Sequence, residues 1–337
     1  MKTNYILAIL AVSILIAGCA TQVTIQSGDN AQDDRRMTTT QGEESTASIE
    51  VTPGLILHTG IHTDQNRGLW IINTDGTGLH KVLSDYVDAK WSPDNKLIAY
   101  VQTDMWIMNA DGSTKAKVGR ADLWPIGEFT WSGDGKYIAY EQKGVAVVNV
   151  AQKDETQLVT EVGEKISGAA WSDLGMVAFI EGKNIKKINA DGKQTEPTLW
   201  LELKDPKALK ASPNMAMLSF SDSGAFWIAK DEKNTDELTQ VSGTVVTNYA
   251  WSPDSKRIIY ESGGKVHIYD TEAKTEVASF AAHNEDRFTW SKDSQWILFT
   301  QKKTGAAENI WIVNAKGAGL KQFTDCPTAC DRPDWSH

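Results

Sequence analysis

The sequence is poor in the residues that metal-dependent and hydrolytic enzymes use most. Among 337 residues there are 3 cysteines and 6 histidines. The Gly-x-Ser-x-Gly turn that presents the serine of α/β-hydrolases is missing. His58 and His62 lie four apart, but in and after an expected strand they share no helical face, which makes the spacing a weak metal signal. The sequence therefore predicts no catalytic residues, no metal site and no cofactor.

Positive charge is also scarce. Lys and Arg number 34 against 44 Asp and Glu, for a formal net charge of −10. No basic stripe interrupts this balance. A surplus of negative charge favours solubility and disfavours nucleic acid or an anionic membrane surface as a partner. We expect a monomer.

No apolar run is long enough to span a bilayer, which takes about 20 residues. The run from Tyr5 to Ala17 stops short of that, and its end overlaps the four residues Ile16-Ala17-Gly18-Cys19. These four residues resemble the lipobox of bacterial lipoprotein signals, and the resemblance implies cleavage after Gly18 and lipidation of Cys19. Plain cleavage with a free thiol is the alternative. Residues 1–18 are then a signal peptide, and the protein is expected outside the cytoplasm, anchored to the cell membrane or outer membrane by its lipid alone.

Residues 19–52 have few large apolar side chains and are rich in Gln, Ser, Thr, Asp and Glu. Such a segment cannot bury a core, and we expect a disordered tether. Residues 53–337 are then one domain, since closed β architectures often reach this size as a single unit.

A repeat organises this domain. Trp-Ser occurs at residues 91, 131, 171, 251, 290 and 335, and Ala211-Ser212-Pro213-Asn214 fills the one gap, so that the period is close to 40 residues. After Trp91 the chain forms a Ser-Pro-Asp turn, an apolar run at 97–101, a second run at 105–108 and an Asp-Gly turn at 111–112. Weaker strands follow. Four strands per period are typical of a propeller blade.

The count of copies predicts an all-β propeller of seven four-stranded blades, with six as the alternative if the unit around Ala211 is not a full blade. The strand pair at 55–58 and 69–72 has no Trp-Ser copy before it, and the copy at Trp335 has no strands behind it. The C-terminal strand is therefore expected to complete the first blade and close the ring, because an open ring would expose strand edges. An aromatic residue about nine positions after each Trp is expected in the core.

Cys326 and Cys330 remain once Cys19 is assigned to the lipid. A disulfide between them would contribute about 2 kcal/mol on the chain-entropy model. Zinc would need two more ligands, and His337 is the nearby candidate in the sequence.

The pattern Trp-Ser-Pro-Asp…Ile-Ala-Tyr…Trp-Ile-Met-Asn-Ala-Asp-Gly of residues 91–112 resembles the TolB-like propeller repeat, a relative of the WD repeat. The resemblance covers nearly all of residues 53–337. It implies a propeller used as a binding surface, whose canal and one rim hold partner proteins of the Tol-Pal system. The chain lacks the α/β domain that precedes the TolB propeller, carries a lipobox, and counts to seven blades where TolB has six.

Function in propellers resides in the loops at the ring faces. The connections between blades hold aromatic and charged residues that would suit an interface. Packing of Trp124 and Trp200 over blade ends is the alternative. The binding-face candidates are Tyr86, Asp122, Trp124, Trp200, His283, Asp286, Arg287, Asp331 and Arg332.

These features favour a non-enzymatic, lipid-anchored scaffold that binds an envelope protein or a glycan. The alternative is a propeller lyase or hydrolase acting on polysaccharide, or a glycan-binding module. Propeller polysaccharide lyases resemble this architecture and use a central His/Gln metal site, which the scarcity of histidine disfavours here. Metal content together with turnover of acidic polysaccharides would distinguish the enzyme from the scaffold.

Overall fold

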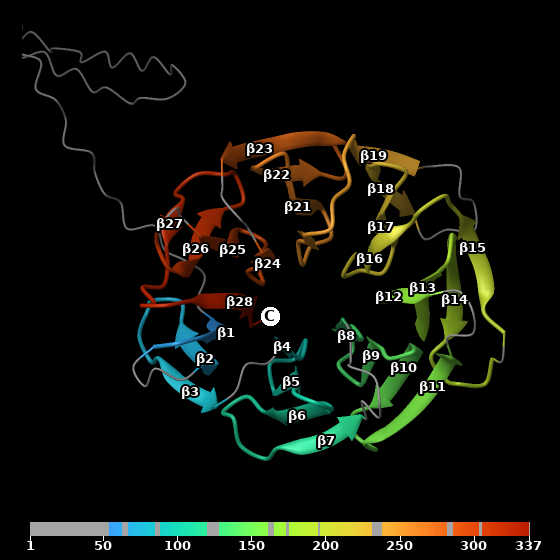
Figure 1. The fold of residues 1–337 in the computed structure, drawn as a ribbon, viewed down its shortest axis with the longest axis horizontal. Coiled ribbons are helices and arrows are strands. Elements are labelled where there is room, and N and C mark those ends of the chain that lie inside the picture. The colour runs from blue at the N-terminus through green and yellow to red at the C-terminus, as the bar shows by residue number, and fades with distance from the viewer. Residues whose placement is uncertain are drawn as a thin grey trace, which may run out of the picture. The chain divides into compact units, whose positions relative to one another are not determined.

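The computed structural model describes residues 54–62, 67–84, 88–119, 128–160, 165–172, 175–194, 196–230, 238–281, 286–302 and 305–336, apart from the side chains of residues 160, 172 and 286. The described chain is built from 28 β-strands in seven four-stranded antiparallel sheets arranged around a central axis (Figure 1). The protein is thus a seven-bladed β-propeller, as the repeat predicts. Within the described residues, no helix is long and apolar enough to cross a bilayer.

Each blade is a four-stranded meander with its innermost strand at one edge of the sheet and its outermost strand at the other. From the innermost strand outward, blades one to four are β28 (Cys330–Trp335), β1 (Leu55–Gly60), β2 (Gly68–Asn73), β3 (His80–Leu83); β4 (Asp88–Trp91), β5 (Leu97–Val101), β6 (Met105–Asn109), β7 (Ala116–Gly119); β8 (Phe129–Trp131), β9 (Tyr137–Glu141), β10 (Gly144–Asn149), β11 (Asp154–Thr160); and β12 (Ile166–Ser172), β13 (Met176–Glu181), β14 (Asn184–Asn189), β15 (Thr198–Glu202).

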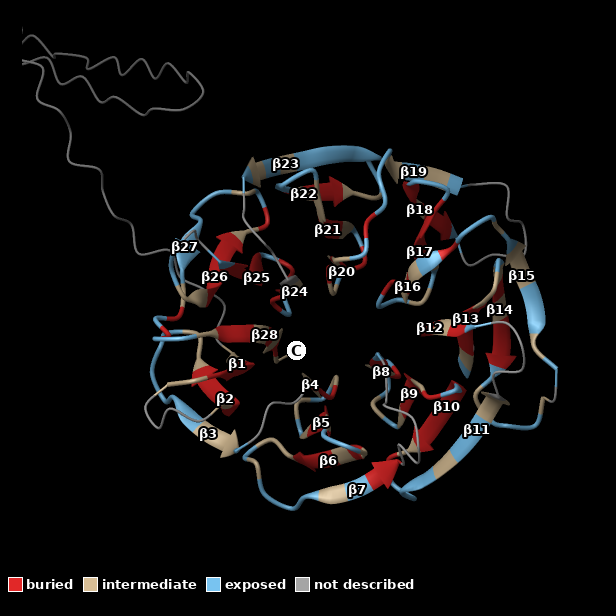
Figure 2. Ribbon diagram, in the orientation of Figure 1, coloured by how far each residue is buried: buried red, intermediate tan, exposed pale blue. Residues whose placement is uncertain are grey.

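Blades five to seven follow the same order. They are β16 (Lys207–Ala211), β17 (Met217–Asp222), β18 (Ala225–Lys230), β19 (Leu238–Ser242); β20 (Tyr249–Trp251), β21 (Arg257–Ser262), β22 (Lys265–Asp270), β23 (Thr275–Ala281); and β24 (Asp286–Trp290), β25 (Trp296–Lys302), β26 (Glu308–Asn314), β27 (Lys321–Gln322). The unit around Ala211 is therefore a full blade, which excludes the six-bladed alternative. Outer strands such as β15 and β23 are mostly exposed, and middle strands are buried (Figure 2).

The ring closes between the two ends of the propeller. β28 pairs antiparallel with β1, with Ile56 opposite Trp335. Ser336 strengthens the pairing, since its N–H donates to the Leu55 carbonyl at 2.9 Å and its Oγ accepts from the Leu55 N–H at 2.9 Å. The prediction that the C-terminal strand completes the first blade is confirmed.

The Ser-Pro-Asp turn is held by its own side chains. In blade two, Ser92 Oγ donates to Asp94 at 2.8 Å and accepts from the Leu97 N–H at 3.0 Å, while Asp94 accepts from the Lys96 N–H at 3.1 Å. The same three contacts recur around Ser252, in a second Ser-Pro-Asp turn, and around Ser291, where Lys replaces the Pro. The turn thus fixes the step from the innermost strand to the second strand.

The repeated Trp joins neighbouring blades. In three blades its indole N–H donates to the main-chain carbonyl of the residue before the Trp of the preceding blade: Trp131 to Lys90 at 3.4 Å, Trp171 to Thr130 at 3.2 Å and Trp290 to Ala250 at 3.2 Å. Trp251 donates instead to Ser219 Oγ at 2.8 Å. The aromatic positions that follow each Trp are buried in the core, as predicted; these are Tyr100, Tyr140, Phe179, Phe220, Tyr260 and Phe299.

Ala211 replaces the Trp in blade five, and the contact to blade four is lost there. Ala170 and Ala211 both border the central cavity. We expect Ala211→Trp to fill part of this space and donate to the Ala170 carbonyl, raising stability by about 1 kcal/mol and the melting temperature by about 2–4 °C. Calorimetry beside Ala211→Leu, which adds apolar volume without the N–H, measures the share of the hydrogen bond. An unchanged or lower melting temperature for Ala211→Trp would show that the gap is needed.

Candidate functional site

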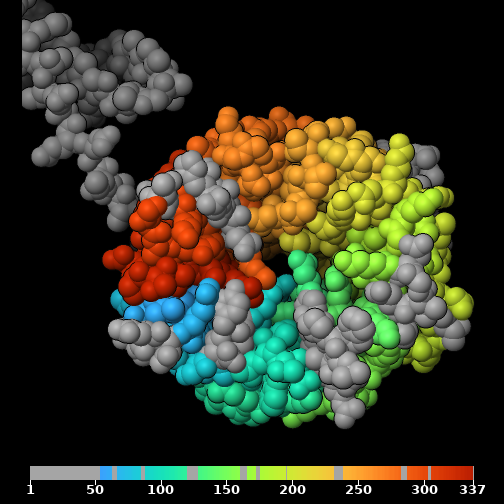
Figure 3. All heavy atoms as spheres, viewed as in Figure 1, coloured from blue at the N-terminus to red at the C-terminus, as the bar shows by residue number. Residues whose placement is uncertain are grey.

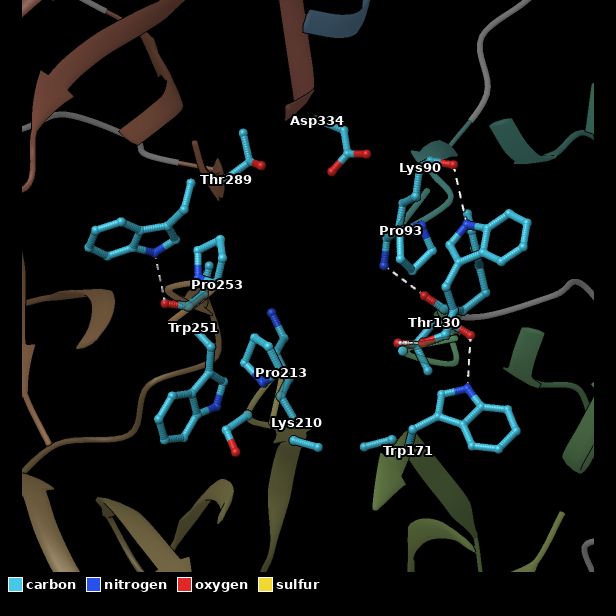
Figure 4. A pocket seen from close by; sticks show the side chains of 18 of the residues that line it. Lys90, Pro93, Thr130, Trp171, Lys210, Pro213, Trp251, Pro253, Thr289 and Asp334 are labelled. Atoms are coloured by element: carbon cyan, nitrogen blue, oxygen red, sulfur yellow. Dashed lines mark hydrogen bonds between the residues drawn. The ribbon is translucent and has the colours of Figure 1, made fainter. Parts of the chain in front are cut away.

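A cavity of about 600 Å³ lies where the seven innermost strands meet. Every one of these strands, from β4 round to β28, contributes lining residues. Figure 3 shows the corresponding hollow at the centre of the ring. The Ser-Pro-Asp turns form one rim, where Pro93, Pro213 and Pro253 face each other across the opening (Figure 4).

The residue just before each repeated Trp lines this cavity. Side chains alternate along a strand. Because the repeated Trp packs between the blades, the residue before it points to the axis of the propeller. The seven residues at this position are Lys90, Thr130, Ala170, Lys210, Ala250, Thr289 and Asp334. Two cations, one carboxylate, two hydroxyls and two methyl groups therefore face the cavity, which is a mixed surface suited to binding.

The two lysines adopt the same pose. Lys90 Nζ donates to the Phe129 carbonyl at 2.7 Å and lies 4.9 Å from the Phe129 ring centroid. Lys210 Nζ donates to the Tyr249 carbonyl at 2.6 Å and lies 4.6 Å from that ring centroid. Each ammonium thus rests on the next blade, and the aromatic face and carbonyl hold it beside the cavity.

Asp334 is the acidic group of the cavity. Its Oδ2 accepts from the Trp91 N–H at 2.7 Å, which ties β28 to β4. Desolvation by the surrounding protein raises the pKa of the Asp334 carboxyl to about 7, against the lowering effect of that hydrogen bond and of Lys90. Near neutral pH the cavity therefore contains a carboxyl that can gain or lose a proton.

At the end of the innermost strands farther from the turns, an ion pair links blade seven to blade two. Arg287 in β24 contacts Asp88 in β4 at 2.6 Å. Both residues stand three positions before a repeated Trp, as does Arg332 in β28. Arg287 and Arg332 share a positive φ of 53° and lie at or beside bulged positions of their strands. Arg287, proposed from the sequence as a binding-face residue, is thus positioned at this end and engaged in a contact between blades.

Asp331 is buried among residues of the first blade. It is 8% exposed, accepts from Thr59 Oγ1 at 2.5 Å and forms an ion pair with Arg67. These contacts join β28 to β1 and to the segment before β2. Asp331 lies in the same strand end as Arg332 but serves the closure of the ring rather than an exposed surface.

Trp200 lies elsewhere than the sequence analysis placed it. The stretch from Lys193 to Lys210 is not one long connection, because it contains the outer strand β15. Trp200 is part of β15, and Lys187 Nζ lies 4.5 Å from its ring centroid. Trp200 therefore packs on the rim of blade four and does not join Arg287 and Arg332. Cys19, Tyr86, Asp122, Trp124, His283 and the side chain of Asp286 lie outside the described residues.

The predicted disulfide between Cys326 and Cys330 is present, with a Cα–Cα distance of 5.8 Å. Two histidines lie beside it. His62 Nε2 is 3.4 Å from Cys330 Sγ and 3.8 Å from Cys326 Sγ, and the ring centroids of His58 and His62 are 5.1 Å apart. His58 is fully buried, and this burial, together with His62, lowers its pKa to about 3. The sequence analysis missed this cluster because the cysteines are more than 260 residues from His62.

The architecture is matched by solved structures of other propellers. TolB from Acinetobacter baumannii superposes with a TM-score of 0.56 at 16% identity, over 84% of this chain and 66% of that chain. The fold is TolB-like. An oligogalacturonate lyase in complex with manganese superposes with a TM-score of 0.57 at 12% identity, over 80% of this chain and 84% of that chain. At these identities the likeness extends to the fold alone.

Sequence comparison adds a short match. Over 114 residues the chain is 27% identical to YuxL, an uncharacterized peptidase of Bacillus subtilis (strain 168). The match covers 30% of this chain and 17% of the peptidase, so that the chain spans a small part of that protein's length. No known protein family's sequence profile matches the chain.

Proposed function

We propose that this protein is a lipid-anchored scaffold of the cell envelope that binds an extended segment of another envelope protein in its central cavity. Lipidation at Cys19 would hold it at the membrane, and residues 19–52 would serve as the tether. The proposal assigns no catalysis to the propeller.

The cavity is the observation that carries this proposal. All seven innermost strands contribute to it, and its wall combines Lys90, Lys210 and Asp334 with the hydroxyl groups of Thr130 and Thr289. An extended peptide presents carbonyls and side chains of both polarities along its length, which such a wall can contact from all sides. The likeness to TolB, a propeller whose family uses its canal for partner proteins, supports the same use.

A substitution at the rim tests the proposal. Gly133 lines the cavity, has a backbone that other residues adopt, and a Cβ there would meet nothing nearer than Met215 Cε at 3.8 Å. Gly133→Trp should therefore narrow the opening with little cost to the fold. Gly243 is the matched control, since a Cβ there would meet only Gln240 Nε2 at 3.7 Å and the residue lies just after the outer strand β19.

The measurement is affinity capture from detergent-solubilised envelopes with wild type, Gly133→Trp and Gly243→Trp. We expect one envelope protein captured by wild type and Gly243→Trp, and reduced at least tenfold by Gly133→Trp. Equal capture by all three would move the binding surface away from the cavity. Turnover of an acidic oligosaccharide, lost in Gly133→Trp, would instead support the polysaccharide-enzyme alternative, for which Lys90 and Lys210 provide positive charge.

A further inference from the structure

The cluster beside the closure of the ring has the composition of a zinc site. We propose that reduction of the Cys326–Cys330 disulfide converts it into a Cys₂His₂ zinc site, with His58 and His62 as the other two ligands. The site would clamp the seam at which the first and last strands of the propeller pair.

The spacing of the four residues fits this use. Cys326 and Cys330 are separated by three residues, as are His58 and His62. Structural zinc sites use pairs of cysteines separated by about two to four residues and pairs of histidines separated by about three to five. The two pairs come from opposite ends of the propeller sequence and meet because β28 pairs with β1.

The distances are close to those that tetrahedral zinc requires. One ligand atom each from His58, His62 and Cys330 lie within 4.8 Å of one another, and Cys326 Sγ is 3.8 Å from either ring nitrogen of His62. With zinc–nitrogen bonds near 2.0 Å and zinc–sulfur bonds near 2.3 Å, ligand atoms of a tetrahedral site lie about 3.3–3.8 Å apart. Small movements of the side chains would bring all four into range once the sulfurs separate.

An independent observation points to a missing ligand at this place. His58 Nε2 is buried and has no hydrogen-bond partner in the structure. A buried polar atom without a partner costs free energy and is rare in folded proteins. The other ring nitrogen, Nδ1, lies 3.3 Å from the Thr59 carbonyl. A backbone carbonyl on one ring nitrogen is the usual arrangement of a zinc-binding histidine, since it directs the lone pair of the other nitrogen to the metal.

The redox step balances with a dithiol reductant. The dithiol transfers two electrons and two protons to the disulfide and is itself oxidised to a disulfide, which leaves two protein thiols. Zinc then displaces the two thiol protons, which pass to solvent. None of the four ligand residues lines the central cavity. Zinc bound here would therefore stabilise the pairing of β28 with β1 and would have no part in reactions in the cavity.

The test uses the full chain in detergent. The protein is reduced with a phosphine, freed of reductant without oxygen, and titrated with zinc alone and with Co²⁺. We expect one equivalent bound, thiolate-to-cobalt charge-transfer absorption, and binding at least 100-fold weaker in the oxidised protein. Zinc should also raise the melting temperature of the reduced protein.

Two variants and a control identify the ligands. His62→Ala, at a partly exposed position, should weaken zinc binding at least tenfold, and Cys326→Ser with Cys330→Ser should abolish the charge-transfer absorption. His80→Ala, at an exposed histidine in the same blade, should bind as wild type does. The proposal is overturned if reduced wild type binds no more zinc than the double serine variant, if His62→Ala binds equally well, or if oxidised and reduced protein bind alike.

Discussion

Trp335→Ala is expected to lower the free energy of unfolding by about 3–5 kcal/mol, the usual cost of truncating a buried Trp to Ala. Trp335 is 1% exposed and packs with Ile56, Trp296 and Leu298, side chains of blades one and seven. Its backbone N–H donates to Thr289 Oγ1 at 3.2 Å, a hydrogen bond that an alanine can still make. The substitution thus removes the side-chain packing that joins the last strand to both neighbours, and the melting temperature should fall by about 6–20 °C.

Trp200→Ala is the matched control for this prediction. Trp200 lies in the outer strand β15 and is only partly buried, and its truncation should cost about 1–2 kcal/mol. Chemical denaturation of both variants gives the two values. Equal losses would mean that the seam contributes no more than an outer strand. We also expect that deletion of residues 334–337 lowers the melting temperature substantially, because it removes the end of β28 that pairs with β1. An almost unchanged melting temperature for this deletion would contradict closure of the ring by β28.

Much of this fold can be predicted from the sequence because each copy of the repeat forms the same strands and the same packing contacts. The indoles of Trp131 and Trp171 each donate to a carbonyl one blade back, and the two Trp residues lie 40 residues apart in the sequence. The Asp-Gly turns are predictable for a local reason. Gly112 has a φ of 82°, and a Cβ there would lie 2.9 Å from Val82 Cβ, so that only glycine fits without strain.

The cavity could also have been found from the repeat. Aligning the copies on their Trp places Lys90, Lys210 and Asp334 at one position, and strand alternation points that position to the axis. The His–Cys cluster carries no such signal. His62 meets the cysteines only through the pairing of β1 with β28, which has no counterpart in local sequence. Trp200 was misplaced because the sequence analysis took the short apolar run Leu199-Trp200-Leu201 of β15 for part of a connection between blades.

Asp334 makes the stability of the protein depend on pH in a direction unusual for an acid. Its pKa in the folded protein is raised to about 7, whereas in the unfolded chain it is about 3.9. Between these values the folded state holds a proton that the unfolded state releases. The stabilisation is therefore fully present below about pH 4 and is lost as the pH rises through about 7. The expected loss is about 1–4 kcal/mol.

His58 acts in the opposite sense over much of the same range. Its pKa is lowered to about 3 by burial and by His62, so that it stays neutral in the folded protein while the unfolded chain binds a proton below about 6.5. Its contribution to stability is present above that value and is lost as the pH falls through about 3. The contributions of these two groups therefore largely cancel between pH 4 and 6.5.

Asp334→Asn should separate the two effects. The amide oxygen can still accept from the Trp91 N–H, but the side chain no longer ionises beside Asp88, Lys90 and Arg287. The variant should therefore gain stability over wild type as the pH rises from about 4 to about 7, by about 1–4 kcal/mol, and the difference should then stay constant. Urea denaturation of both proteins at intervals from pH 4 to 8 measures it. A difference that is independent of pH would mean that Asp334 titrates alike in both states; one that favours wild type near neutrality would mean that its charge stabilises the closed ring.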